Sequence, residues 1–273
     1  MTIATNNKIN TIKPTNITSN TQSLVFINQK GGVGKTTSVV NIASCLVKQN
    51  KKILVIDLDP QANTTTASGI EKNNISQSIY HVLLGLSDIN DAIISSSTCF
   101  YDIIPANRDL AGVEIELIDF EDRELCLSNA IKSLKKNYDL ILIDCPPSLS
   151  LLTINALTAS LHLLVPIQCE YYALEGLTDL LNTIHKIKAK LNPNLNFLGL
   201  FRTMFDKRNK LSQQVSEQLL EHFKDKLFET TIPRNIRLAE APSFGMSAVI
   251  LDPKSIGAIA YKSLTTEILK RLQ

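Results

Sequence analysis

Short apolar runs alternate with longer segments of helical periodicity along most of this chain. The apolar runs predict strands at residues 24–28, 53–57, 101–105, 140–144, 161–167 and 197–203. The helical patterns lie at residues 36–49, 124–135, 151–159, 173–191, 211–223 and 255–272. Because the predicted strands are apolar on both faces and alternate with helices, we expect an α/β fold in which helices cover both faces of a mostly parallel sheet.

The first 22 residues do not share this pattern. They are rich in Thr, Asn, Ser and Lys and contain few large apolar side chains. Such a segment cannot bury enough surface to offset its ordering entropy, so we expect a disordered tail at residues 1–22. No linker interrupts the remainder, which predicts one domain at residues 23–273.

Composition narrows the functional classes only slightly. The net charge of +2 gives the whole molecule no polyanion-binding signature, so a nucleic-acid site would have to be a local patch. We find neither an apolar run long enough to cross a membrane nor a signal peptide. Five scattered cysteines without a C-x-x-C pair predict reduced thiols in a cytoplasmic protein.

The segment after the first predicted strand carries the most informative pattern, Lys30-Gly31-Gly32-Val33-Gly34-Lys35-Thr36-Thr37. Glycines let the backbone turn tightly and point N–H groups at an anion, and the dipole of the following helix adds partial positive charge. Lys35 would reach the β- and γ-phosphates of a nucleotide, and the Thr36 hydroxyl would bind Mg²⁺. The segment departs from the general P-loop pattern, since Gln29 replaces the first glycine and Lys30 is an additional lysine.

Three acids stand at the ends of two other predicted strands. Asp57 and Asp59 end the second strand, and Asp144 ends the fourth. Open α/β sheets bind ligands at the carboxyl ends of their strands. An apolar strand that ends in Asp is the usual Walker B form, whose carboxylate holds Mg²⁺ directly or through water. Together with the glycine loop, these acids predict a site for a magnesium nucleotide.

Four segments together resemble the ParA/Soj family of DNA-partitioning ATPases. They are residues 30–37, 57–63, 143–148 and 232–245. This family is part of the deviant Walker A group, which also contains MinD and the nitrogenase iron protein. The resemblance extends from about residue 23 to the end of the chain. It implies a P-loop NTPase-type fold, an ATP hydrolase, and ATP and Mg²⁺ as cofactors.

The resemblance also implies how the glycine loop works. Residues 30–37 would bind the nucleotide, with Lys35 and Thr36 as the ordinary phosphate and magnesium residues. Lys30 matches the signature lysine, which in this group reaches across an ATP-sandwich dimer to the phosphates of the partner. A complete catalytic site would then depend on an ATP-dependent homodimer.

Further roles follow from the other matching segments. Asp59 matches the catalytic acid that positions or activates the attacking water, Asp57 its magnesium-side neighbour, and Asp144 the Walker B acid. Pro233 and Asn235 match the segment that borders the adenine. Phosphoryl transfer needs charge neutralisation and an aligned water more than covalent help, which fits these residue types.

Basic residues gather in the last third of the chain. They are Lys186, Lys188, Lys190, Lys207, Arg208, Lys210, Arg234 and Arg237. A basic stripe can bind the phosphate backbone without reading sequence, although a solvated lysine-rich surface is the preferred interpretation from the residues alone. The resemblance reverses that preference, because Arg208 and Arg237 fall where the family's non-specific DNA-contacting arginines lie.

The resemblance also implies the biological setting. It implies association with the nucleoid and with non-specific double-stranded DNA, no membrane contact, and a ParB-type centromere-binding partner that stimulates hydrolysis and releases DNA. Whether the cargo is a chromosome or a plasmid stays open.

Three alternative functions share parts of this pattern. A MinD-like septum-positioning ATPase should end in a basic amphipathic helix that lies on membrane. Here the last helix, with Ile259, Leu264, Ile268, Leu269 and Leu272, is expected to turn an ordinary apolar stripe towards the core. A nitrogenase-like reductase needs cluster cysteines, and none of the five stands in that context. A scaffold that only binds nucleotide would not need an intact Asp59.

Overall fold

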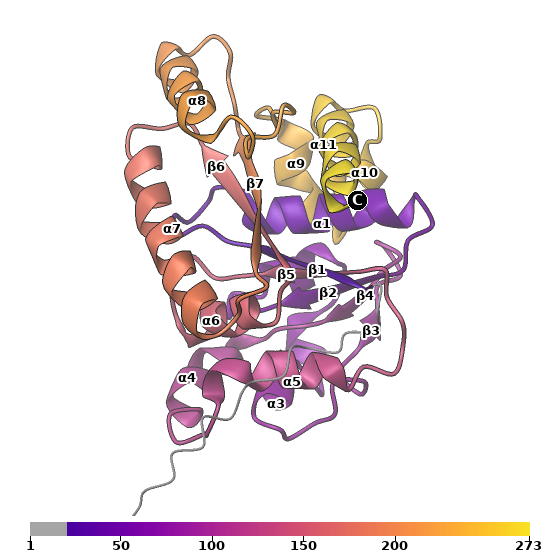
Figure 1. Cartoon of the computed structure of the whole chain (residues 1–273). Helices are drawn as coiled ribbons and strands as arrows, with labels where there is room; N and C mark the ends of the chain where they lie inside the picture. Colours follow the sequence, from indigo (N-terminus) through magenta and orange to yellow (C-terminus); the bar gives the residue numbers. More distant parts are fainter. Residues whose placement is uncertain (1–20) are drawn as a thin grey trace, which may run out of the picture.

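Seven strands form one sheet in the computed structural model, which describes residues 21–273 (Figure 1). Their order across the sheet is β3-β4-β2-β5-β1-β6-β7. All neighbouring pairs are parallel except β3 with β4. The strands are β1 (Gln22–Phe26), β2 (Ile53–Asp57), β3 (Ile94–Ser95), β4 (Asp102–Ile104), β5 (Leu140–Asp144), β6 (His162–Gln168) and β7 (Asn196–Thr203). The predicted α/β fold with a mostly parallel sheet is thereby confirmed.

At the centre of the sheet, strands β1, β2 and β5 end at the same level. Phe26 at the end of β1 and Asp57 at the end of β2 both pair with Asp144 at the end of β5. The glycine loop leaves β1 at this point, beside both acids. Parallel pairing therefore assembles residues that are more than a hundred positions apart in the chain.

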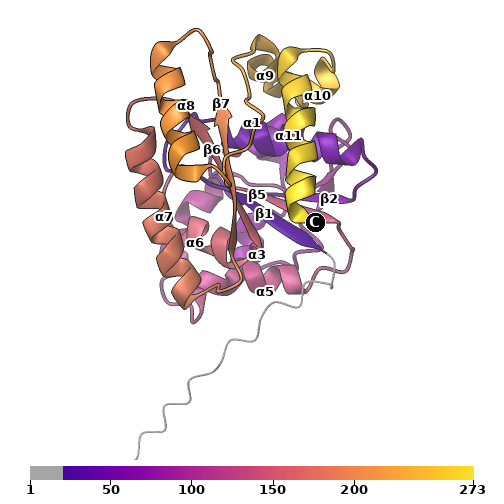
Figure 2. The same ribbon diagram turned by 45° about the horizontal axis from the view of Figure 1, so that its top comes forward.

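Helices cover both faces because alternate strand residues point to opposite sides. Along β1, Val25 packs in one core and its neighbours Leu24 and Phe26 pack in the other. The first core is closed by α3 (Ile79–Leu83), α4 (Val113–Glu116), α5 (Cys126–Lys132), α6 (Leu151–Thr158), α7 (Ala173–Lys190) and α8 (Lys210–Phe223). The second is closed by α1 (Lys35–Val47), α2 (Asn63–Ala67), α9 (Ile236–Glu240), α10 (Ala248–Leu251) and α11 (Ile256–Leu272). Figure 2 shows α7 and α11 on opposite sides of the sheet.

The structure adds short elements that the sequence pattern does not reveal. They are β3, α2, α3, α4, α9 and α10, each of two to five residues, together with four short 3₁₀ segments. The expected helix at 124–135 is shorter, since a 3₁₀ turn at Arg123–Leu125 precedes α5. Elements of two to five residues span at most about one helical turn, so no period can be read from them.

The predicted tail at residues 1–22 falls mainly outside the described residues, which begin at Thr21. Its last two residues belong to the fold. Gln22 is the first residue of β1, and the Thr21 hydroxyl donates to the carbonyl of Tyr138 at 2.7 Å. Thr21 and Gln22, which the prediction assigned to the tail, are therefore part of the described fold.

The closing helix α11 follows the expected stripe with one exception. Leu264 and Ile268 are fully buried, and Leu269 and Leu272 pack partly buried against the same core. Ile259 is instead 51% exposed. Within residues 21–273, no helix combines the length and apolar character needed to cross a membrane.

Candidate active site

The loop after β1 has a backbone shape that requires glycine. Gly32 and Gly34 have φ angles of 74° and 88°, in the left-handed region that residues with a Cβ rarely adopt. Gly34 is the N-cap of α1, so the loop leads directly into a helix N-terminus. The Thr203 hydroxyl, at the end of β7, donates to the carbonyl of Val33 at 2.8 Å. The loop is therefore held by β7 as well as by the strand and the helix that flank it.

The two lysines of this loop point to different places. The Lys35 ammonium is buried and donates to the carbonyls of Asn28 and Lys30 at 3.1 and 3.4 Å, inside the loop. Burial lowers its pKa, while the nearby carboxylates of Asp144 and Asp59 act in the opposite direction. Lys30 is half exposed, and its ammonium forms an ion pair with Glu170 just beyond β6. Lys35 thus closes the phosphate loop, whereas Lys30 faces outwards.

Asp144 joins this loop to the sheet. Its Oδ2 accepts hydrogen bonds of 2.6 Å from the hydroxyls of Thr36 and Thr64. Its Oδ1 is buried and has no hydrogen-bond partner in the described part of the chain. Burial raises the pKa of Asp144, against the effect of those hydrogen bonds and of the Lys35 charge. A carboxylate and a hydroxyl are the hard oxygen donors that Mg²⁺ prefers, so Asp144 and Thr36 fit a magnesium site.

Asp57, the predicted magnesium-side neighbour, is held by hydrogen bonds within its own chain. It is fully buried, and both of its oxygens accept hydrogen bonds from the adjacent chain. Oδ1 accepts from the backbone N–H of Asp59 at 3.1 Å, and Oδ2 accepts from the N–H and hydroxyl of Thr65 at 2.8 and 2.7 Å. Burial and the neighbouring Asp144 raise its pKa. Asp57 therefore holds the turn that carries Asp59, since its side chain faces the adjacent backbone.

Asp59 lies where an acid could act on a bound phosphate. It lines a cavity of about 480 Å³ together with the glycine loop, Lys35 and Thr36. Its Oδ1 accepts from the backbone N–H of Gln61 at 2.9 Å, which fixes the side chain in the turn after β2. The structure therefore brings Asp59, Lys35 and Thr36 together, as the sequence predicts.

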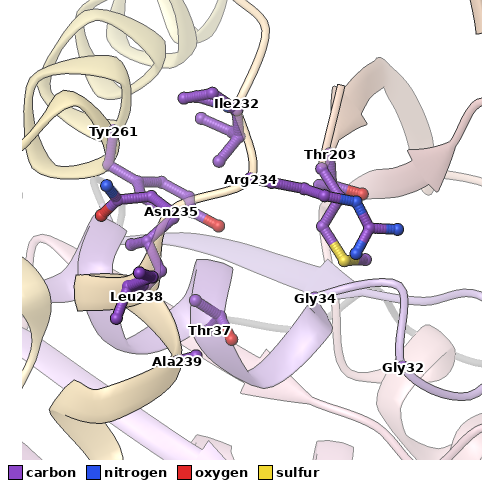
Figure 3. Close-up of a pocket in the computed structure, with 13 residues that line it drawn as sticks. Gly32, Gly34, Thr37, Thr203, Ile232, Arg234, Asn235, Leu238, Ala239 and Tyr261 are labelled. Carbon is purple, nitrogen blue, oxygen red and sulfur yellow. The ribbon is translucent and has the colours of Figure 1, made fainter. Parts of the chain in front are cut away.

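A second cavity, of about 390 Å³, adjoins the glycine loop (Figure 3). The segment after β7 forms one wall, including Pro233 and Asn235, and Thr37 and Tyr261 lie on the helices beside it. The Asn235 Oδ1 is buried without a hydrogen-bond partner in the described residues. A buried amide oxygen of this kind needs a donor, and the exocyclic amine of adenine is one. This cavity matches the predicted adenine segment.

Sequence reasoning missed several residues of the site. Thr203, Met204, Arg234 and Tyr261 line the second cavity, and Thr64 donates a hydrogen bond to Asp144. Thr203 had a usable signal, since it ends a parallel strand at the ligand-binding edge of the sheet. Thr64 follows the second quoted motif directly, but nothing in its own spacing points to a carboxylate 80 positions away.

The predicted basic stripe divides into separate groups. Lys190 ends α7 and precedes the start of β7, whereas Lys207 follows the end of that strand. Eight residues of strand separate the two ends by about 25 Å, so the α7 lysines do not join the later basic residues. Arg208 and Arg237 are exposed, and each is paired with carboxylates of this chain. The two arginines remain candidates for DNA contact, without the α7 lysines.

Comparisons with known proteins agree with this site. A family model described as an AAA domain matches residues 21–197. The sporulation initiation inhibitor protein Soj of Bacillus subtilis is 49% identical over 245 residues, which are 90% of this chain and 97% of that protein. The chromosome partitioning protein ParA of Myxococcus xanthus is 45% identical over 244 residues, which are 89% of this chain and 86% of that protein.

A solved structure shares the architecture. Cobyrinic acid a,c-diamide synthase from Mycobacterium smegmatis, with a bound ATP analogue and magnesium, is 34% identical with a TM-score of 0.81. The match covers 92% of this chain and 96% of that one. A phosphate loop, two strand-end acids and relatives of this similarity over most of their length lead to one assignment. The chain belongs to the ParA/Soj family of partitioning ATPases.

Proposed function

We propose that this protein is a ParA-type ATPase in which ATP drives formation of a sandwich dimer that binds DNA without sequence preference. Hydrolysis, stimulated by a ParB-type partner, then releases the DNA. The observation that carries the proposal is the division between the two loop lysines. Lys35 completes the phosphate loop of its own subunit, while Lys30 points out of it and pairs with Glu170 at the surface.

The residues at the strand ends support the hydrolytic step. Lys35 and the N–H groups of the loop would bind the phosphates, and Thr36 with Asp144 would hold Mg²⁺, which neutralises the charge that develops on the phosphoryl oxygens. Asp59 lies on the same cavity and would orient the attacking water. Thr203 holds the loop in shape, so little reorganisation is needed when the nucleotide binds.

The outward position of Lys30 supports a requirement for a second subunit. An ammonium that is half exposed and held by a surface carboxylate can exchange partners at little cost, because exposed ion pairs contribute little stability. In a sandwich dimer, Lys30 would leave Glu170 and contact the phosphates of the partner. The site would then be complete only in the dimer.

DNA binding rests on Arg208 and Arg237, which are exposed on the segments that follow β7. Arg237 belongs to α9, and other residues of α9 line the adenine cavity. Occupation of the cavity can therefore affect the surface that carries this arginine. This arrangement supports a protein whose affinity for DNA depends on its nucleotide.

A mixing experiment tests the shared site. Lys30→Ala and Asp59→Ala should each turn over ATP very slowly alone. In a mixed dimer, the Lys30→Ala subunit keeps Lys35 and Asp59 and receives Lys30 from the other subunit. An equal mixture should recover about a quarter of the wild-type rate, since half of the dimers are mixed and each has one complete site.

Two results would contradict this proposal. One is wild-type turnover by Lys30→Ala alone, which would show that Lys30 is not needed. The other is a mixture with no recovered activity although size-exclusion chromatography shows mixed dimers. Binding of a fluorescent ATP analogue by each variant checks that the nucleotide site is folded.

A further inference from the structure

Both arginines proposed to contact DNA are held by carboxylates of their own chain. The Arg208 guanidinium makes a two-pronged contact with Asp206, from Nε to Oδ1 at 3.1 Å and from Nη2 to Oδ2 at 3.0 Å. Arg237 contacts two acids, with Nη1 at 3.0 Å from Glu240 Oε2 and Nε at 3.4 Å from Asp252 Oδ2. The two sites come from different segments, and at each of them acids of the same chain contact the guanidinium.

These contacts occupy the groups that would bind DNA. A guanidinium binds a phosphate through the same planar fork of N–H donors that it offers to a carboxylate. Asp206 occupies the Nε and Nη2 edge of the Arg208 guanidinium and offsets its charge, so Arg208 offers a phosphate fewer N–H donors and a weaker attraction. At Arg237, one positive charge faces two negative charges, so the group as a whole repels a polyanion.

We propose that Asp206, Glu240 and Asp252 mask Arg208 and Arg237, and that DNA binding exchanges these carboxylates for DNA phosphates. The inference rests on the proposed DNA-binding function and adds the regulation of that surface. The acids lower the affinity of the nucleotide-free protein for DNA. They act as competitors within the chain and are not part of the phosphate-contacting surface.

The masks are suited to reversible exchange. Arg208 is 91% exposed and Arg237 is 53% exposed, so water screens both contacts and neither is strong. Asp206 stays ionised under physiological conditions, because hydrogen bonds from Arg208 lower its pKa to about 2, with a smaller contribution from Arg234. A duplex offers many phosphates at once and can displace a single carboxylate, especially from two subunits together.

The adenine cavity is placed to influence both masks. Asn235, Ile236, Leu238 and Ala239 line the cavity, and Arg237 lies among them on α9. Its contact with Asp252 ties α9 to the end of α10, so a shift of α9 around a nucleotide would change that contact. Arg234 also lines the cavity and lies close enough to lower the pKa of Asp206 (Figure 3).

Charge-neutral substitutions test the masks directly. Asp206→Asn keeps an acceptor for the backbone N–H of Arg208, which donates to Asp206 at 2.9 Å, so the turn is preserved. The second variant combines Glu240→Gln with Asp252→Asn. The matched control is Asp225→Asn, which changes an exposed acid two residues beyond α8 for which the described residues include no ion pair. The double variant is compared with a second control that also neutralises Glu217, exposed on α8.

Binding to a random duplex is measured without nucleotide and with a slowly hydrolysed ATP analogue, at several salt concentrations. Without nucleotide, each mask variant should bind about 2–5-fold more tightly than its control, with a steeper dependence on salt by about one phosphate for each arginine released. In the Arg208→Ala background, Asp206→Asn should no longer raise DNA affinity relative to Arg208→Ala alone. An effect of net charge alone would raise the affinity equally in both backgrounds.

The outcomes separate this inference from the proposed function. If the wild type fails to bind DNA with the ATP analogue, the proposed function is wrong. If the wild type binds but the mask variants match their controls, or if the gain persists without Arg208, the masking inference is overturned and the function stands. Urea denaturation of each variant checks that folding is unchanged.

Discussion

The Thr36 hydroxyl donates to Oδ2 of Asp144 at 2.6 Å, and this contact joins the first turn of α1 to the end of β5. The other oxygen of Asp144 is buried without a partner in the described residues. Asp57 lies beside it in register on β2, also fully buried. The surroundings of Asp144 therefore disfavour its ionised form, and a bound Mg²⁺ would stabilise that form.

Asp144→Asn should increase stability and abolish hydrolysis. The substitution removes a buried charge next to a second acid, and it should raise the free energy of unfolding of the nucleotide-free protein by about 1–2 kcal/mol. It also removes the carboxylate expected to hold Mg²⁺, so ATP turnover should fall to background. Urea denaturation and a phosphate-release assay measure the two effects. A variant that is less stable and still active would contradict both parts.

The stability difference should also depend on pH. Burial raises the folded-state pKa of Asp144 to about 6, so the folded protein resists an ionisation that the unfolded chain undergoes at lower pH. The resulting loss of stability is absent below the unfolded-state pKa of about 3.9, grows as pH rises to the folded-state value and is constant above it. The advantage of Asp144→Asn should therefore be small near pH 4 and larger near pH 7. An advantage that shrinks over this range would exclude burial as its cause.

Asp59→Ala should bind ATP but hydrolyse it at least about 100-fold more slowly, because the carboxylate that would orient the attacking water is removed. The variant should then accumulate as a dimer with ATP, which size-exclusion chromatography detects. Lys35→Ala serves as the opposite control, since loss of the buried ammonium inside the loop should prevent ATP binding itself. A monomeric Asp59→Ala protein in ATP, or wild-type turnover, would count against this role.

The long elements and the phosphate loop could be predicted because their signals are local. Strands β1, β2 and β5 are apolar on both faces, and the glycine loop is specified by consecutive residues. The direction of a single side chain could not be predicted in this way. Asp57 and Asp59 stand two positions apart at a strand end, yet one faces its own backbone and the other faces the cavity.

Long-range contacts were also beyond the sequence pattern. The ion pair of Lys30 with Glu170 spans 140 positions. Arg237 also contacts Asp252, which follows the four-residue helix α10, and so short a helix shows no periodicity. The prediction of one continuous basic stripe was wrong for a related reason. Counting charges along the chain ignores that the α7 lysines and Lys207 lie near opposite ends of strand β7.

Asp102→Asn should destabilise the edge of the sheet. Asp102 on β4 is buried and accepts hydrogen bonds from the ammonium of Lys136 and the hydroxyls of Ser95 and Tyr138. Burial raises its pKa, but these three donors outweigh burial and leave the pKa lowered. Losing the charge should lower the free energy of unfolding by about 1–3 kcal/mol.

The sign of the pH effect at Asp102 is opposite to that at Asp144. Because the folded-state pKa of Asp102 is lowered, its contribution is present above the unfolded-state value of about 3.9 and is lost as pH falls below it. The cost of Asp102→Asn, measured by urea denaturation, should therefore be full at pH 7 and decrease below about pH 4. A cost that is constant with pH would mean that shape, not charge, matters at this site.

Gly199→Ala should destabilise the protein, because β7 has no room for a Cβ at this position. Gly199 has a φ of 154°, and an added Cβ would lie 2.2 Å from the carbonyl oxygen of Lys226 and 2.6 Å from Nη1 of Arg271. That guanidinium donates to the carbonyls of Leu198, Lys226 and Leu227, at 3.2, 3.1 and 2.9 Å. The substitution must displace backbone as well as these hydrogen bonds, so the free energy of unfolding should fall by about 2–4 kcal/mol.

Gly176→Ala is a matched control for this substitution. Gly176 lies within α7 and is exposed, with no atom within 4 Å of an added Cβ. Alanine restricts the unfolded chain and favours the helix, so the free energy of unfolding of this variant should rise by about 0.5–1 kcal/mol. Urea denaturation of both proteins compares the same chemical change in two surroundings. If both variants shift in the same direction, glycine content rather than the close approach of Lys226 and Arg271 would account for the effect at Gly199.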